Sequence, residues 1–465
     1  MHVSAESVIW PGITRVLLFL LPIGVLLGPY AAIGPATLFR VVVVALMVCA
    51  VVVGRSWRHE LWLIALGLLW LVVGLVSGMV GPYSPGWAEL ANLMVGFALA
   101  WSLARLRIIG PRTEGCVAAP RRAAQNPSAQ TTLVPKLAAP KRLVPNLVAL
   151  NWLALGWEAA VLISAPVAVW ERLTTRHLSG FIDGQWRGRP LVYPFPGTFF
   201  VNPNYYALFL AVGVAVLCYR AVRTRGWARA GHATICLVAA ALVVLTESLA
   251  CVIALGCMLA GALLVVRRGI WVVLAMCVVG ALAVATTMSS LAVRLADMWQ
   301  QVWAGHDQGS SSFPVRMALL SFGIHLVVAN PWLGVGPGGF AKAAAHADPA
   351  LFHLHHKINP HNGILQVATE YGLPLAGCLL MVWAWIGVRS WRRRREDPAL
   401  AGLALALVLS APPLSIANSL YIGPNVVALW MGLLVLTAAM TDTLSRRGAG
   451  PGKGPVQSIG ESQCE

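Results

Sequence analysis

The stretch Leu61-Trp-Leu-Ile-Ala-Leu-Gly-Leu-Leu-Trp-Leu-Val-Val-Gly-Leu-Val-Ser-Gly-Met-Val80 contains no charged residue. A helix of about 20 apolar residues is long enough to cross the hydrocarbon core of a bilayer. Similar stretches recur along the chain, which has 465 residues, of which 58% are hydrophobic and 11% charged. Soluble domains carry about 25% charged residues. The sequence therefore predicts an all-α integral membrane protein.

Hydropathy predicts about twelve transmembrane helices. The predicted spans are residues 13–30, 36–54, 61–80, 87–105, 147–169, 203–222, 231–248, 250–266, 270–288, 364–388, 399–417 and 425–441. Only a polar kink, Thr246-Glu247-Ser248, separates the seventh span from the eighth. The first apolar run, Ile13–Leu27, has no small-residue cleavage site after it, so we expect a retained helix.

The net charge of +17 would suit a nucleic-acid-binding protein, but the positions of the basic residues argue against that class. They cluster in short segments between apolar runs, the pattern that sets the orientation of a membrane protein. With the N-terminus inside, 24 of the 34 basic residues lie in cytoplasmic segments and eight in outer ones. We therefore expect both termini in the cytoplasm and two long segments on the outer side of the membrane.

The chain divides into four parts by composition. We expect N-terminal transmembrane helices in residues 1–109 and a disordered, basic cytoplasmic linker rich in Pro and Ala in 110–146. We expect a second transmembrane region in residues 147–441, with long outer loops at 170–202 and 289–363, and a disordered cytoplasmic tail in 442–465. None of the nine cysteines falls in an outer segment, so no disulfide framework is implied.

The first outer segment contains four arginines on the side where positive charge is scarce: Arg172, Arg176, Arg187 and Arg189. Guanidinium groups bind phosphate in a bidentate manner, so these arginines are candidate ligands for a phosphorylated substrate. A solvated loop or one that faces lipid headgroups is the alternative. The segment ends at Asn202-Pro-Asn204, which is suited to begin a membrane helix.

The second outer segment contains an arginine, an apolar stretch and a glycine-rich turn. Arg316 precedes the apolar residues Met317–Val328, and Asn330-Pro331 leads into Trp332-Leu-Gly-Val-Gly-Pro-Gly-Gly-Phe340. No strand–turn–helix unit surrounds these glycines, so they are not a dinucleotide fingerprint. We expect them to permit tight backbone turns, and a backbone-amide nest for phosphate is the alternative.

Histidines gather just before the tenth span. His353, His355, His356 and His361 suggest zinc, but their spacing matches no standard closed site and neither cysteine nor a well-placed carboxylate joins them. We therefore expect no metal and no other cofactor. His361 differs from the others because it stands at the start of the helix that returns into the membrane.

Polar residues form a stripe on that returning helix. Asn362, Gln366 and Glu370 lie at i, i+4 and i+8 and so share one face. Polar groups inside a bilayer usually face the bundle interior or a water-filled cavity. A helix cap with interhelical hydrogen bonds is the structural alternative. Glu158 lies near the middle of the fifth span, where an unpaired carboxylate is costly. We expect it to be protonated, to pair with an arginine or to line a cavity.

Four features, in order, resemble the O-antigen ligase and polymerase superfamily of bacterial membrane glycosyltransferases. They are Gly197-Thr-Phe-Phe-Val-Asn-Pro-Asn204, Arg316 with the apolar helix after it, Asn330–Phe340, and His361-Asn-x-x-Leu-Gln-x-x-x-Glu-x-Gly372. The resemblance covers roughly residues 150–390. It departs from the family at the kink, where many members carry a Ser-Arg pair and this chain has Thr246-Glu247-Ser248.

The resemblance implies an inverting, metal-independent transfer of a glycan from undecaprenyl diphosphate to a sugar hydroxyl of lipid A–core, or to another glycan or protein acceptor. It also implies a protein of the bacterial inner membrane that acts at the periplasmic face, so that the outer loops 170–202 and 289–363 are periplasmic. By this analogy His361 is the catalytic base, and Arg316, Arg187 and Arg189 hold the donor diphosphate. Asn362, Gln366, Glu370, Asn202, Asn204 and Glu247 would support the site.

Three other functions are compatible with the same pattern. An O-antigen polymerase and a protein O-glycosyl ligase belong to the same class of enzyme. A transporter of a small anion or of a lipid-linked sugar belongs to a different class, and it would need a polar pathway to the cytoplasm and often repeated halves with broken helices. Neither signal is evident, because the strong polar features lie on one side.

Overall fold

A computed structural model describes most of the transmembrane region. It covers residues 6–34, 36–53, 60–83, 86–106, 147–178, 185–186, 189–190, 195–200, 202–265, 312–348, 360–417 and 425–448. The predicted linker at 110–146, the predicted span 270–288 and the histidines at 353, 355 and 356 lie outside these ranges.

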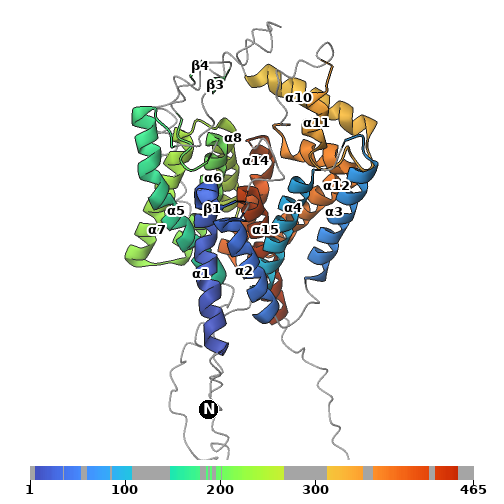
Figure 1. Ribbon diagram of the computed structural model, residues 1–465. Helices are drawn as coiled ribbons and strands as arrows, with labels where there is room; N and C mark the ends of the chain where they lie inside the picture. Colours follow the sequence, from blue (N-terminus) through green and yellow to red (C-terminus); the bar gives the residue numbers. More distant parts are fainter. Residues whose placement is uncertain are drawn as a thin grey trace, which may run out of the picture.

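The described part is a bundle of helices (Figure 1). In chain order the helices are α1 (Glu6–Leu27), the 3-10 helix η1 (Gly28–Ala31), α2 (Leu38–Val53), α3 (Leu61–Val80), α4 (Trp87–Leu106), α5 (Leu147–Thr174), α6 (Pro203–Arg223), α7 (Gly226–Leu245), α8 (Leu249–Leu263), α10 (Ser312–Ala329), α11 (Gly339–Ala345), α12 (Gly363–Arg392), α13 (Pro398–Leu409), α14 (Ala411–Ala417) and α15 (Asn425–Gly448).

Seven of the described helices are long and apolar enough to cross a membrane: α1, α3, α4, α5, α6, α7 and α12. Shorter apolar helices occur at Leu38–Val52, Leu249–Leu263, Arg316–Ala329, Pro398–Leu409 and Asn425–Thr441. The chain is thus a multi-pass membrane protein made of helices, as the sequence predicts. The full set of twelve spans and their orientation stay predictions.

The helix pattern differs from the sequence prediction in two places. The predicted span 399–417 is two helices, α13 and α14, which meet at Ser410. Pro412 and Pro413 follow, and because they lack an amide hydrogen they cannot continue the hydrogen-bond ladder of α13. The predicted outer loop 289–363 contains α10, which is the apolar helix expected after Arg316, and also the short helix α11, which the sequence did not predict.

Two short antiparallel hairpins interrupt the helical fold. Strand β1 (Ala32–Ile33) pairs with β2 (Ala36–Thr37) between α1 and α2. Strand β3 (Gln185–Trp186) pairs with β4 (Arg189–Pro190) in the first predicted outer segment. In Figure 1, β3, β4, α10 and α11 lie at the upper end of the bundle, whereas α1 begins at the lower end.

The centre of the bundle is helix α6. Its residues from Tyr206 to Leu217 are all buried, which is typical of a helix that is apolar on every side and enclosed by others. Trp157 of α5 stacks on Phe209 of α6, with ring centroids 5.5 Å apart, and donates a hydrogen bond to the Phe209 carbonyl oxygen. Helix α6 is therefore enclosed by neighbouring helices, and the first outer segment ends at its N-terminus.

The buried carboxylate of Glu158 is paired. Its Oε1 lies 2.6 Å from His232 Nδ1 and 3.4 Å from Arg220 Nε, which join α5 to α7 and α6. Of the possibilities that the sequence allowed for this residue, the structure shows the one with an arginine partner, and it adds a histidine. An unpaired carboxylate at this depth would cost several kcal/mol.

Candidate functional site

The start of helix α12 is held by a polar clamp. Asn362 caps the helix, because its Oδ1 accepts a hydrogen bond from the Leu365 amide at 3.0 Å. Ser415 of α14 donates to the same Oδ1 at 3.3 Å, and its own oxygen accepts from the Ile364 amide at 3.0 Å. The clamp fixes the first turn of α12 against α14. No sequence signal singles out Ser415.

His361 directly precedes this cap and has an unusual backbone. Its φ is +49°, in the left-handed region that residues other than glycine seldom adopt. Such conformations cost on the order of 1–3 kcal/mol and gather at functional sites. The side chain is partly buried. The structure therefore holds the predicted catalytic residue in one strained position, next to a helix N-terminus.

Gln366 and Glu370 lie further along the same helix and face the protein interior. Their exposed fractions are 1% and 2%, and Gln366 Nε2 is 3.5 Å from both carboxylate oxygens of Glu370. The backbone amides of Gly338 and Phe340 also donate hydrogen bonds to Glu370. Gln366 and Glu370 are thus buried, whereas Asn362, the first residue of the stripe, is partly buried and caps the helix. The cap and its hydrogen bond with Ser415 are the contacts that the structural alternative expected, and Glu370 anchors the glycine-rich turn.

Helix α12 is broken at Gly372, where φ is +85° and ψ is 167°. Because the helix is interrupted there, the backbone carbonyl oxygens just before Gly372 lose the amide donors that a continuous helix would supply. The Val335 amide donates to the Thr369 oxygen at 2.8 Å and the Gly336 amide to the Glu370 oxygen at 3.1 Å. After the break, the Leu373 amide donates to the Pro331 oxygen at 2.8 Å. The glycine-rich turn therefore fills the gap in α12.

The glycines are needed for this close fit. Gly334, Gly336 and Gly338 all have positive φ, and a Cβ added at Gly334 would lie 2.5 Å from the Thr369 oxygen. The prediction of tight backbone turns is confirmed. The alternative was that the backbone amides of this turn form a nest that binds phosphate. In the structure these amides donate hydrogen bonds to acceptors of the protein itself, so the turn has a structural role.

Helix α10 packs against the first turn of α12. A Cβ added at Gly323 would lie 2.5 Å from Leu365 Cδ2, so the two helices touch there. Arg316 lies seven residues, or about two turns, before Gly323 and hence on the same face of α10. Arg316 is partly buried, and burial lowers the pKa of its guanidinium from the ordinary value. The group stays cationic near neutral pH, because the ordinary pKa of a guanidinium lies far above neutrality.

The end of the first outer segment forms the start of α6. Asn202 Oδ1 accepts a hydrogen bond from the Asn204 amide at 2.8 Å, and Pro203 occupies the first helical position. This confirms the prediction that Asn-Pro-Asn begins a helix. Of the three arginines predicted to bind diphosphate, two belong to this segment: Arg187 lies outside the described residues, and only the backbone of Arg189 is described, in β4.

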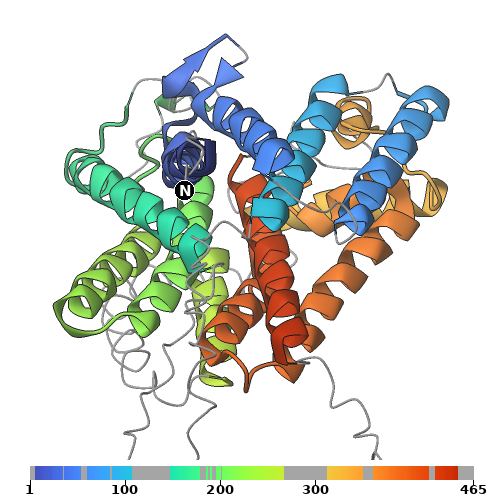
Figure 2. The same cartoon turned by 90° about the horizontal axis from the view of Figure 1, so that it is seen from below.

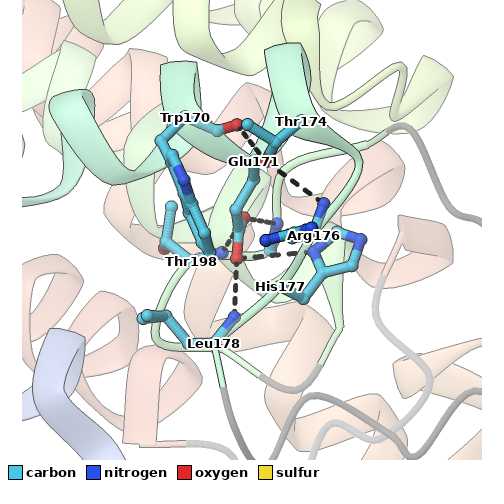
Figure 3. Close-up of polar contacts among 8 residues, drawn as sticks. Trp170, Glu171, Thr174, Arg176, His177, Leu178 and Thr198 are labelled. Carbon is cyan, nitrogen blue, oxygen red and sulfur yellow. Dashed lines mark hydrogen bonds and ion pairs between the residues drawn. The ribbon is translucent and has the colours of Figure 1, made fainter.

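A carboxylate that sequence reasoning passed over, Glu171, organises the same segment (Figure 3). Its side chain is fully buried. Its Oε2 accepts from the Gly197 amide at 2.9 Å and the Thr198 amide at 2.8 Å, and its Oε1 accepts from the Leu178 amide at 3.4 Å. His177 Nδ1 lies 3.4 Å from Oε1. Glu171 thus ties the end of α5 to the loop before α6.

An arginine does approach the kink between α7 and α8. Arg172 Nη2, at the end of α5, is 3.6 Å from Glu247 Oε1, and the Arg172 guanidinium lies 6.0 Å from the centre of the Phe195 ring. Glu247 has a φ of +53°, which turns the chain from α7 into α8. The kink residue is therefore held to the first outer segment by an ion pair.

Among the described residues, no group of three or more His, Cys, Asp or Glu side chains could hold a metal ion. This search does not include His353, His355 and His356, which lie outside the described ranges. The zinc alternative of the sequence therefore stays untested for the histidine cluster.

Comparison with known families gives one match. Residues 234–380 match the model of a family described as O-antigen ligase. The matched range includes the kink at Glu247, helix α10, the glycine-rich turn and the outer part of α12 with His361. No curated protein matches the chain.

Proposed function

We propose that the chain acts as an O-antigen ligase and transfers a glycan from undecaprenyl diphosphate to a sugar hydroxyl of lipid A–core, because residues 234–380 match the model of a family described as O-antigen ligase. The proposed site is at the periplasmic face of the bacterial inner membrane. It lies where α10, the glycine-rich turn and the start of α12 meet.

The observation that carries the proposal is the contact between Gly323 of α10 and Leu365 of α12. It joins the helix that carries Arg316 to the helix that begins just after His361. A cation and a base on two touching elements are what glycan transfer from a diphosphate requires.

In the proposed reaction, His361 accepts the proton of the acceptor hydroxyl. The hydroxyl oxygen forms a bond to the anomeric carbon, and the bond between that carbon and the diphosphate oxygen breaks. Attack from the opposite face inverts the anomeric centre. Histidine suits this role because it titrates near neutral pH.

Negative charge grows on the leaving diphosphate in the transition state. Arg316, with Arg187 and Arg189 from the first outer segment, would bind it. Fixed cations accelerate the reaction when they bind the transition state more tightly than the ground state. Partial burial of Arg316 favours this, because charges interact more strongly away from bulk water.

The supporting residues would act by position. Asn362 fixes the first turn of α12 beside His361. Gln366 and Glu370 hold the glycine-rich turn. Asn202 caps the start of α6 by accepting a hydrogen bond from the Asn204 amide. Glu247 holds Arg172 at the kink, where other family members have an arginine.

The distribution of basic residues supports the periplasmic assignment of the site. Elements of both predicted outer segments lie at the upper end of the bundle, opposite the beginning of α1 (Figure 1). The proposed site is therefore far from the end that positive charge predicts to be cytoplasmic.

Transfer assays with His361 variants test the proposal. We expect His361→Asn to lower the transfer rate by about 10²–10⁴-fold, the usual contribution of a general base. Asparagine tolerates the left-handed backbone, so the variant should remain folded. His346→Asn, at the exposed end of α11, is the matched control and should keep full activity. Normal transfer by His361→Asn would exclude the base assignment.

Arginine variants test the diphosphate assignment. We expect Arg316→Ala to lose most activity and Arg316→Lys to recover only part of it, because lysine lacks the bidentate geometry. Equal activity of the lysine variant would indicate simple charge attraction instead.

A deletion strain distinguishes the ligase from the polymerase. Loss of a ligase should leave bare lipid A–core while lipid-linked polymer accumulates, whereas loss of a polymerase should leave core capped by one repeat unit. If no surface glycan changes, both functions are excluded.

A further inference from the structure

An apolar cleft lies among helices α2, α3, α4, α12 and α15, apart from the proposed site. Its volume is about 130 Å³, close to the ~150 Å³ of an engineered apolar cavity that admits benzene. The enclosed part therefore has room for a segment of a hydrocarbon chain but not for a headgroup. In Figure 2, α3 and α4 (two shades of blue) lie on the same side of the bundle as α12 (orange) and α15 (red).

The lining of the cleft is almost entirely apolar and includes Trp62, Trp70, Phe97 and Trp383. No charged residue lines it, and apart from the indole groups its polar side chains are Asn92 and Asn425. Helices α3, α4 and α12 are each long and apolar enough to cross a membrane, so the cleft lies at the depth of the lipid chains.

The two asparagines lie at one end of the cleft. Asn92 is in the second turn of α4 and Asn425 begins α15, and the predicted topology places both helix starts on the outer side. Arg40, in the first turn of α2, donates a hydrogen bond from Nη2 to Asn92 Oδ1 at 2.7 Å. The outer end is thus polar and cationic.

A separate cluster forms the opposite end of the cleft. Leu63, Ala100 and Val435 line the cleft and, together with Ala104 and Ala439, make an apolar group distinct from the main core. Leu63 is at the start of α3 and Ala100 is near the end of α4. The inner end of the cleft is therefore lined by aliphatic side chains and by Trp62, in contrast to the polar outer end.

We propose that this cleft binds one acyl chain of an anionic glycerophospholipid of the outer leaflet, with the lipid phosphate at Arg40. A phosphodiester carries one negative charge and matches a single arginine. A diphosphate carries more charge and suits the several arginines of the proposed donor site. Basic groups between transmembrane helices are known to select anionic lipids.

The proposal is independent of glycan transfer and is tested by lipid binding to the purified, delipidated full chain. We expect native mass spectrometry to show one retained phosphatidylglycerol. We also expect phosphatidylglycerol to raise the unfolding temperature by several degrees more than phosphatidylcholine with the same acyl chains, since a ligand that binds only the folded state stabilises it.

Two variants separate the headgroup contact from the chain contact. Arg40→Gln should abolish the preference for phosphatidylglycerol, and Arg40→Lys should keep most of it. Gly96→Leu should prevent lipid retention, because Gly96 lines the cleft and an added Cβ meets Ala428 Cβ at an ordinary 3.6 Å. Leu68→Trp, at a position of α3 that is 55% exposed and outside the cleft, is the matched control and should retain lipid.

Three results would overturn the proposal. They are an unchanged preference for phosphatidylglycerol in Arg40→Gln, retained lipid in Gly96→Leu, or displacement of phosphatidylglycerol by undecaprenyl diphosphate. The last result would assign the cleft to the lipid-linked donor instead.

Discussion

Replacing Glu171 by glutamine removes the charge from a carboxylate that is fully buried and accepts hydrogen bonds from the Gly197 and Thr198 amides. Glutamine keeps one acceptor oxygen but turns an NH₂ group toward the remaining donors. Hydrogen bonds to charged groups contribute about 1.5–3 kcal/mol each. We therefore expect the free energy of unfolding to fall by about 2–3 kcal/mol in Glu171→Gln.

Glu171→Ala should be more severe. It leaves both amides without the carboxylate, and an unsatisfied buried donor costs about 1–3 kcal/mol. The expected loss is about 2–6 kcal/mol, together with faster proteolysis of the segment between α5 and α6, because Glu171 is the group that joins them.

The free energy can be measured by denaturant titration in mixed micelles, with limited proteolysis as the local readout. Glu396→Gln is the matched control: its side chain is 48% exposed and pairs with Arg393 within one helical turn. Exposed pairs contribute about 0–1 kcal/mol. If Glu171→Gln destabilises no more than Glu396→Gln, the carboxylate does not hold the loop.

Two further changes probe the joints around the proposed site. In a thermal-unfolding assay, Gly372→Ala should destabilise the protein by several kcal/mol, because Gly372 has a backbone conformation reserved for glycine and an added Cβ would lie 2.2 Å from the Trp332 oxygen. Gly377→Ala is the control: its Cβ meets nothing within 4 Å, so it should be neutral or stabilising by up to about 1 kcal/mol. A double-mutant cycle of Arg172→Gln and Glu247→Gln should give a coupling free energy of about 1 kcal/mol, and additive effects would show that the ion pair does not join α5 to the kink.

The sequence predicted most of the helices because apolar runs of membrane length leave few alternatives. It located eleven of its twelve spans on helices that the structure describes. It did not predict the break in α12, because the span 364–388 was interpreted as one continuous helix. The carbonyl oxygens of Thr369 and Glu370, freed by the break, accept hydrogen bonds from residues 34 positions earlier, and no local pattern predicts those contacts.

The candidate site was predictable only in part, for the same reason. His361, Asn362 and Arg316 stand out by residue type and place in local patterns. Glu171 and Ser415 act through contacts made by folding, and nothing near them in the sequence marks those contacts. Arg172 was noted as one of four outer arginines, but its pairing with Glu247 joins residues 75 positions apart.

The break at Gly372 has a mechanical consequence. The outer segment of α12, from Gly363 to Tyr371, is bonded sideways to the glycine-rich turn and packed on α10, whereas its backbone connection to the rest of α12 passes through one glycine. The turn is bonded beyond the break as well, because the Leu373 amide donates to the Pro331 oxygen and the Gly86 amide, just before α4, donates to the Pro337 oxygen. The position of the segments that carry Arg316 and His361, relative to the deeper half of α12, is therefore set by hydrogen bonds of the turn and not by a continuous helix.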